Sequence, residues 1–316
     1  MNLARPRRRS GTLGDALFWG AAFGAALLVL ILLGAIAMST LIGGYPTFAR
    51  FGFGFLSKLV WDPVRREFGA LVPIYGTLVT ALIGLLLAVP VAFGIAVFLT
   101  EVAPRRLAVP TSAAIELLAG IPSIIYGMWG LFVFAPFMAN TLDPWLSNTL
   151  GVVPGLAPLF SGPPLGLGML TAGIILSIMI VPFIAAVMRD VFRLVPPPLR
   201  ESAFALGATR WEVVWHVALP YTRTAVWGAI FLGLGRALGE TMAVTFVLGN
   251  SHDFNISLLA PSTSIAATIA NEFTEADSPD YLSALIALGF ILFVITFLVL
   301  LLAKLMLLRL AKQGAR

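Results

Sequence analysis

Six long runs of apolar residues decide what this chain can fold into. They contain few charged residues and lie at 16–42, 71–99, 110–136, 167–188, 225–249 and 282–303. Each run has about 20 residues or more, enough for a helix to cross a hydrocarbon core about 30 Å thick. In lipid a spanning backbone must satisfy its own hydrogen bonds, and the two-residue alternation of a membrane β-barrel strand is absent. The sequence therefore predicts an all-α, polytopic membrane protein with six transmembrane helices.

The composition excludes a water-soluble fold. Of the 316 residues, 59% are hydrophobic and only 11% are charged, which is too few charges to cover the surface of a soluble domain. The net charge of +5 does not indicate nucleic acid here, because the arginines lie at the ends of apolar runs, where they set topology and meet membrane lipid. The chain has no cysteine, which excludes disulfides, thiolate metal sites and thiol catalysis.

Basic residues are concentrated in alternate connections. They occur in the N-terminal tail, after the second and fourth runs and at the C-terminal end, whereas 137–166 and 250–281 contain no Lys or Arg. The positive-inside rule therefore predicts that both termini are cytoplasmic. One connection departs from the rule, residues 43–70, which contains Arg50, Lys58, Arg65 and Arg66.

The apolar runs predict a single membrane domain. We expect it at 16–308, with a cytoplasmic segment at 189–222 and cytoplasmic tails at 1–15 and 309–316. A signal peptide is the alternative for the first run, because arginines at 5–9 precede it and Ala35-Ile36-Ala37 resembles a cleavage site. The run is longer than the usual h-region of about 7–15 residues, so we expect an uncleaved helix.

The segment 189–222, which we call the knob, predicts two short helices. Prolines at 196–198 end the preceding helix, and the last of them suits the first position of a new one. That helix is expected to run to about Leu206, with Gly207 as its left-handed terminator. Thr209 and Glu212 have the spacing of a capping box at the start of a second helix. Pro220 would end this second helix and start the next span.

Residues of the knob resemble the signature of ABC importer permeases. Glu201-Ser202-Ala203, Gly207 and Val217-Ala218-Leu219-Pro220 fit the pattern E-A-A, three residues, G, nine residues, I-x-L-P, with Ser202 and Val217 as departures. The resemblance implies a type I ABC importer permease fold, in which the knob is a coupling helix that docks in a cleft of the ATPase subunit. The implied coupling residues are Glu201, Ala203, Gly207, Leu219 and Pro220. The alternative is an ordinary interfacial helix pair.

Arg236 is expected near the middle of the membrane. It lies 13 residues after Arg223 and 14 before Asn250, which is about 20 Å along a helix from either. A central arginine costs at least about 2.5–3.5 kcal/mol on insertion scales, so it must be turned inward and partnered. Glu240 lies four residues on, on the same helix face and within pairing reach. The sequence thus predicts a buried Arg236–Glu240 pair.

This pair has two interpretations. In the functional one, Arg236 offers its planar fork of donors to a translocating oxyanion, and Glu240 holds the guanidinium when the passage is empty. In the structural one, the pair fixes helix register, as polar residues in membrane helices often do. Small residues near the same face suit either an open passage or a closely packed helix: Ala229, Gly233 and Ala243.

Three segments resemble the phosphate-specific (Pst) ABC permeases. They are Gly235-Arg-Ala-Leu-Gly-Glu-Thr-Met-Ala-Val-Thr-Phe-Val-Leu-Gly-Asn250, Val72-Pro-Ile-Tyr-Gly-Thr-Leu-Val-Thr80 and Ala119-Gly-Ile-Pro-Ser-Ile-Ile-Tyr-Gly-Met-Trp-Gly130. They resemble the PstC-like subunit more than its PstA-like partner, and the resemblance extends from about residue 70 to the C-terminus.

The Pst resemblance implies a function, a location and partners. The chain would be one permease of a heterodimer with a PstA-like subunit in the bacterial inner membrane. Two ATPase subunits would drive the pore, and a periplasmic phosphate-binding protein would supply it with inorganic phosphate. Arg236 and Glu240 would take part in phosphate translocation.

Glu116 is a further candidate for the passage. It lies ten residues after Arg106, about 15 Å inside the predicted third span. Ile121-Pro122 just beyond it should kink or break the helix. Glu116 would pair with a basic residue of a partner chain or shape a gate; the alternative is a hydrogen-bonded or interface-facing carboxylate.

The connection 250–281 has five acidic residues and no Lys or Arg. Such an acidic mouth would repel free phosphate within a Debye length of about 8 Å, which favours delivery of the substrate by a docked protein. A solvated loop whose charge follows from topology is the alternative.

No motif indicates an enzyme, a metal or a cofactor. A Walker A motif needs Gly-Lys, and none of the three lysines follows a glycine, so ATP must bind another chain. His216 and His252 lie on opposite sides in this topology and cannot share a metal. The sequence predicts a non-catalytic permease subunit. The alternatives are a permease for sulfate or molybdate, a stand-alone secondary anion transporter or channel, which would not need the knob, and an intramembrane enzyme, which lacks a nucleophile or metal set here.

Overall fold

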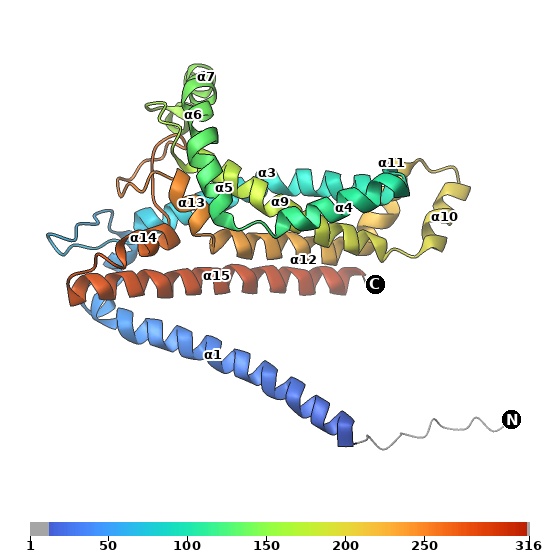
Figure 1. The fold of residues 1–316 in the computed structure, drawn as a ribbon, viewed down its shortest axis with the longest axis horizontal. Coiled ribbons are helices and arrows are strands. Elements are labelled where there is room, and N and C mark those ends of the chain that lie inside the picture. Colours follow the sequence, from blue (N-terminus) through green and yellow to red (C-terminus); the bar gives the residue numbers. More distant parts are fainter. Residues whose placement is uncertain (1–12, 315–316) are drawn as a thin grey trace.

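The computed structural model describes residues 13–314, and within them the fold is helical without any strand longer than an isolated bridge (Figure 1). Six helical segments are long and apolar enough to cross a membrane. They are Gly14–Phe51, Leu71–Val102, Ser123–Thr149, Met169–Arg193, Arg210–Leu238 and Pro279–Arg309. The predicted all-α fold with six spans is confirmed. The arginines at 5–9 and Arg316 lie outside the described residues.

Most elements follow one another with short connections, and longer ones lie at 58–70 and 248–264. The elements are α1 (Leu13–Phe51), α2 (Gly54–Ser57), α3 (Leu71–Val97) with a π-helical end at Phe98–Val102, α4 (Arg105–Ala119), α5 (Ser123–Trp129), α6 (Ala135–Phe137), α7 (Asp143–Thr149), α8 (Ala157–Phe160), α9 (Met169–Arg193), α10 (Pro197–Ala205), α11 (Arg210–Val213), α12 (Leu219–Leu238), α13 (Met242–Val247), α14 (Ile265–Glu272) and α15 (Pro279–Gly314). π-Helical turns join α5 to α6, α6 to α7, and α11 to α12.

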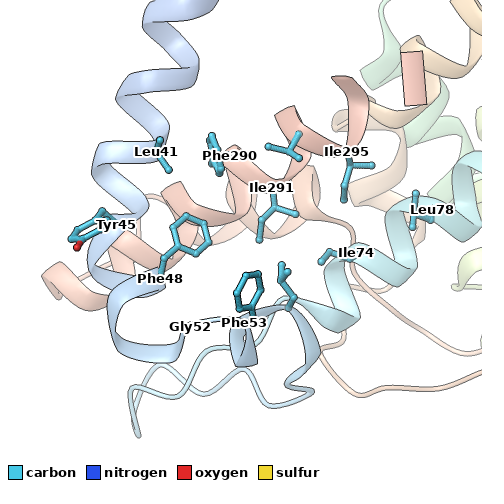
Figure 2. Close-up of a pocket in the computed structure, with 12 residues that line it drawn as sticks. Leu41, Tyr45, Phe48, Gly52, Phe53, Ile74, Leu78, Phe290, Ile291 and Ile295 are labelled. Atoms are coloured by element: carbon cyan, nitrogen blue, oxygen red, sulfur yellow. The ribbon is translucent and has the colours of Figure 1, made fainter. Parts of the chain in front are cut away.

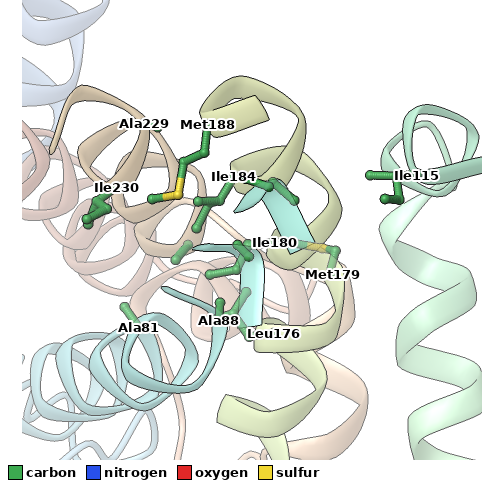
Figure 3. Packing of buried hydrophobic residues seen from close by; sticks show 14 of the residues in the cluster. Ala81, Ala88, Ile115, Leu176, Met179, Ile180, Ile184, Met188, Ala229 and Ile230 are labelled. Atoms are coloured by element: carbon green, nitrogen blue, oxygen red, sulfur yellow. The ribbon is translucent and has the colours of Figure 1, made fainter. Parts of the chain in front are cut away.

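The core of the bundle lies where α3, α9 and α12 pack together. Buried alanines of α3 face large side chains of α9, among them Leu176 and Ile180 (Figure 3). A Cβ on Gly84 would lie 3.1 Å from the Leu176 side chain. Lipid is as apolar as these side chains, so close van der Waals contact is what holds the helices together, and small residues permit it.

The first helix touches the bundle only near its end. Gly43 and Gly44 pack against Ile286 and Ala287 of α15, and Thr47 Oγ1 donates to Ser283 Oγ at 2.9 Å. Residues 14–36 are exposed throughout, and α1 diverges from α15 in Figure 1. The start of α1, the end of α15 and the α10–α11 corner lie toward the same end of the molecule.

Two predicted spans are broken in the structure. The third, expected at 110–136, is interrupted at 120–122, so that α4 precedes a membrane-length segment at 123–149. Pro122 causes this break because it cannot donate a backbone hydrogen bond. The fifth, expected at 225–249, ends as a helix at Leu238 and resumes at Met242. Figure 1 shows α5, α6 and α7 turning away from the direction of α3, α9 and α12.

The motif at 72–80 supports a loop that folds back against α3. Thr263 is buried, and Thr77 Oγ1 accepts a hydrogen bond from the Ile265 backbone N–H at 2.9 Å. A Cβ on Gly76 would overlap the carbonyl oxygen of Thr263. Glycine and threonine at these positions therefore seat the loop 248–264 on the helix.

We expect Gly76→Val to destabilise the protein by about 1–3 kcal/mol, because overpacking against backbone cannot be relieved by a rotamer change. The measurement is the thermal unfolding midpoint of the purified protein in detergent. Gly94→Val is the matched control, since it lies in the same helix and a Cβ there meets nothing within 4 Å. Equal loss of stability in the two variants would contradict the role of Gly76.

Candidate functional site

Arg236 and Glu240 do not share a helix. Arg236 lies in the last turn of α12, which ends at Leu238. Glu240 follows the break, and its Oε1 accepts a hydrogen bond from the Ala243 backbone N–H at 3.2 Å, at the start of α13. Among the residues the structure describes, Arg236 forms no salt bridge. The predicted ion pair is therefore not formed here, because the break at 239–241 turns Glu240 off the helix face that holds Arg236.

The surroundings of Arg236 are aromatic. Its guanidinium carbon lies 5.7 Å from the ring centroid of Phe183 in α9, and Tyr126 of α5 is close enough to interact with its charge. The Tyr126 hydroxyl donates to the Leu118 carbonyl oxygen of α4 at 3.1 Å. Arg236 itself is exposed on this chain. A cation at this depth needs water or another molecule against it, because an unpartnered charge in hydrocarbon is costly.

The small residues beside Arg236 are packing positions. Ala229 is buried, and a Cβ on Gly233 would lie 2.5 Å from the Ile184 side chain of α9. These residues therefore do not border an open passage. They allow α12 and α9 to pack closely, which is the other interpretation of the sequence. The exposed face of α12 is a different one, which Arg236 shares with Leu232.

The motifs at 119–130 and 235–250 meet each other. A Cβ on Gly127 of α5 would lie 2.8 Å from the Phe246 ring and 3.0 Å from the Met242 carbonyl oxygen of α13. A Cβ on Gly130 would contact Val247 at 2.9 Å. The half-helices that follow the two breaks thus lie side by side, and the break of α12 lies beside the start of α5.

Glu116 lies in α4, outside the six membrane-length segments. Its Oε1 is 2.8 Å from Arg189 Nη1, and Arg189 also binds Asp190 at 2.7 Å. Arg189, which the topology argument treats as a loop residue, is a buried residue of α9 with a side chain that is 5% exposed. The basic partner expected for Glu116 is therefore present in the same chain.

The knob has the local structure that its sequence predicts. Gly207 ends α10 with φ at +89°, a left-handed conformation that favours glycine. Thr209 Oγ1 accepts from the Glu212 N–H, and Glu212 accepts from the Thr209 N–H at 2.7 Å, which completes the capping box. One expectation is wrong: Pro220 does not end the second helix, because the π-helical turn at Val214–Ala218 carries it continuously into α12.

The knob presents an exposed, concave surface. Glu201 and Gly207 are exposed and Ala203 is partly exposed. Ala203 and Gly207 line a hollow of about 340 Å³ together with Glu212 and His216. Leu219 and Pro220 lie at the base of the knob, where α12 begins. The coupling residues expected from the sequence therefore occupy one corner of the molecule, whereas Arg236 lies at the other end of α12, in its last turn.

An anchor of the knob was not predicted. Arg200 Nη2 lies 2.9 Å from Glu101 Oε1 and donates to the Phe192 carbonyl oxygen at 2.6 Å. The Glu101 side chain is 8% exposed. The contact ties α10 to the ends of α3 and α9. A carboxylate at the end of an apolar run was the only sequence signal for it.

The acidic residues of 250–281 are partly neutralised. Asp280 binds Arg50 at 2.7 Å. Glu272 accepts hydrogen bonds from Trp61 at 2.7 Å and Tyr281 at 2.6 Å, and lies 2.6 Å from His252. Burial acts to raise the pKa of Glu272, but these contacts outweigh it and hold the pKa below its usual value. Arg50 therefore offsets the charge of Asp280, whereas Glu272 stays ionised.

No group of three or more His, Cys, Asp or Glu side chains with metal-binding geometry occurs in the part of the chain that the structure describes. His252 is stacked on Trp61 and His216 lies on the knob.

Comparison with known proteins places these features in a family. The family model described as binding-protein-dependent transport system inner membrane component matches residues 88–312. A phosphate transport system permease protein PstC of Mesorhizobium japonicum is 55% identical over 308 residues, which are 97% of this chain and 94% of the relative. A PstC of Haemophilus influenzae is 58% identical over 281 residues, 89% of each chain.

Solved structures share the fold at low sequence identity. A chain of a bacterial alginate ABC transporter, solved with a periplasmic protein, has a TM-score of 0.60 at 18% identity and matches 92% of this chain and 94% of its own length. A chain of the MetNI methionine ABC transporter, in an inward-facing conformation, has a TM-score of 0.55 at 15% identity, with 79% and 99% coverage.

We expect Glu101→Gln to loosen the knob, because it leaves the partly buried Arg200 without its counter-charge and breaking such a pair costs up to about 3–5 kcal/mol. Limited trypsin digestion of the purified protein should cut faster within 200–210. Glu201→Gln is the control, since this neighbouring carboxylate is exposed and forms no salt bridge among the described residues. Identical cleavage rates in both variants and the parent protein would show that the anchor is unimportant.

Proposed function

Because the chain belongs to the PstC family of phosphate transport permeases, we propose that it is a membrane-spanning pore subunit of an ATP-driven phosphate importer. Identity to such permeases along nearly the whole chain is the observation that carries this conclusion. The subunit is non-catalytic, and the ATP-hydrolysing site belongs to another chain. A stand-alone transporter, or a permease for sulfate or molybdate, is not favoured.

Arg236 is the residue we assign to the substrate. Its exposed guanidinium has no carboxylate bound to it among the described residues, so its donors remain free for two oxygens of a phosphate ion. Glu240 caps the start of α13 through its hydrogen bond to the Ala243 N–H. Its negative charge repels a phosphate ion that moves from Arg236 toward α13. Glu116 binds Arg189 and shapes the passage at its knob end.

Coupling to ATP hydrolysis occurs at the knob. Glu201, Ala203 and Gly207 offer an exposed surface to an ATPase subunit. The continuous helix from Arg210 to Leu238 carries a movement of the knob, through Leu219 and Pro220, toward Arg236. The Glu101–Arg200 contact makes the knob move together with the ends of α3 and α9.

The proposed assembly contains three kinds of partner. A second, PstA-like permease covers the exposed face of α12 and completes the passage beside Arg236. Two ATPase subunits bind the two knobs, and a periplasmic binding protein supplies phosphate. Both termini are cytoplasmic in the bacterial inner membrane, as the positive-inside rule requires and as the placement of α1, α15 and the knob toward one end supports.

Arg236→Gln should lower phosphate uptake by about tenfold or more, since charge-assisted hydrogen bonds contribute about 1.5–3 kcal/mol. The measurement is uptake of radiolabelled phosphate into proteoliposomes that contain the whole complex. Arg236→Lys keeps the charge but loses the fork, so an intermediate rate is expected. Arg65→Gln, which removes an exposed arginine outside the knob, is the control. Normal rate and affinity in Arg236→Gln would reject the assignment.

Gly207→Val should uncouple ATP hydrolysis from transport, because a β-branched residue resists the left-handed backbone and reshapes the docking surface. The ratio of phosphate imported to ATP hydrolysed is measured in the same proteoliposomes and should fall severalfold. Gly155→Val is a matched control: Gly155 also has a positive φ, +92°, with open space at its Cβ, and lies outside the knob. Normal coupling in Gly207→Val would count against the knob as the docking site.

A further inference from the structure

An apolar groove lies between α1, α2, α3 and α15. Its volume is about 650 Å³. Figure 2 shows side chains of α1, α3 and α15 around one open space. The lining is aliphatic or aromatic, and includes Leu41, Phe48, Phe53, Leu78, Phe290 and Ile295.

The groove has the depth of one membrane leaflet. Arg50 marks the polar end of α1, where it binds Asp280 at the start of α15. Leu41, at the far end of the groove, lies nine residues before Arg50, which is about 14 Å along the helix. Half of a hydrocarbon core about 30 Å thick has the same extent. The leaflet is the one on the side opposite the knob.

Two cations lie near the polar end of the groove along the chain, although neither lines it: Arg50 precedes the lining residue Gly52 by two positions, and Lys58 follows the lining residue Leu56 by two. Arg50 Cζ and Lys58 Nζ each lie 5.1 Å from the centroid of the Phe51 ring. Phe51 lies between two groove residues, Phe48 and Gly52, in the sequence. Arg50 already has Asp280 as a partner, whereas Lys58 forms no salt bridge within the described part of the chain. Both belong to the connection that departs from the positive-inside rule, so topology does not account for them.

We propose that this groove binds an anionic phospholipid, with one acyl chain between α1 and α15 and the phosphate headgroup at Lys58 and Arg50. An acyl chain gains no hydrophobic free energy by moving from the bilayer into an apolar groove, so the headgroup must supply the selectivity. Lys58, which has no carboxylate partner within the described part of the chain, supplies it by Coulomb attraction to a headgroup with net negative charge. A helix of another protein would fill the apolar part but would leave the charge of Lys58 unused.

The bound lipid would restrict the motion of the C-terminal part of α1, near Thr47. The groove lies beside the contact in which Thr47 and Ser283 join α1 to α15. The remainder of α1 has no contact with the bundle that buries it. A lipid that touches α1, α3 and α15 together therefore limits how far the long exposed part of α1 can swing. This role is independent of the ion that the complex transports.

Native mass spectrometry of the detergent-purified complex tests the proposal. After delipidation, phosphatidylglycerol or phosphatidylcholine is added back, and bound lipid is counted. The parent complex should retain phosphatidylglycerol severalfold better than phosphatidylcholine. Lys58→Gln should abolish this preference. Leu78→Trp, which fills the groove, should reduce retention of both lipids.

Two control variants separate the groove from the general surface. Arg65→Gln removes another cation of the same connection, with a side chain that is 80% exposed, and Leu82→Trp enlarges a lipid-facing residue of α3 outside the groove. Both should bind phosphatidylglycerol like the parent complex. Unchanged lipid preference in Lys58→Gln would overturn the proposal. So would a photoreactive residue at Ile295 that crosslinks to the second permease and not to lipid.

Discussion

A backbone inside lipid must satisfy its own hydrogen bonds. This constraint explains why most of the structure is helical and why its few helix breaks need neighbouring protein around them. Most of the chain meets it with long helices. The exceptions are the breaks at 120–122 and 239–241, and the half-helices that follow them pack against each other through Gly127 and Gly130. Irregular backbone at membrane depth is tolerated where it is buried in protein or lines a cavity. The break at 239–241 begins three residues after Arg236, so irregular backbone and the exposed charge occur next to each other.

Charges within this protein have two kinds of surroundings. Arg189 and Arg200 are largely buried and bind carboxylates of the same chain, Glu116 and Glu101. Arg236 is exposed, and its guanidinium lies over the ring of Phe183. A buried pair is expensive to desolvate and holds elements in register, whereas an exposed fork of donors is available to an anion. The arginines at the knob end therefore make α3, α4, α9 and α10 a unit, whereas the donors of Arg236 stay exposed.

The predictions from the sequence were accurate where the determinant was local. The six spans, the left-handed Gly207 and the Thr209–Glu212 capping box depend on residues that are neighbours along the chain. The expected Arg236–Glu240 pair failed because it assumed a continuous helix through Gly239. The break that Ile121-Pro122 predicts is present, but the third span lies at 123–149 and not at 110–136. The Glu101–Arg200 contact joins residues 99 positions apart, and no local pattern predicts such a distance.

The sequence by itself determined that the chain crosses a membrane, how often it does so, which segments form the knob and which family it resembles. These properties depend on hydrophobicity, on spacing and on residue types at fixed offsets, all of which act over a few helical turns. Only the tertiary structure decided which charges are neutralised and which remain exposed. It also decided that Ala229 and Gly233 serve packing and that a groove lies between α1 and α15. Those outcomes depend on which helix faces meet, because a side chain finds its partner across the bundle and not along the chain.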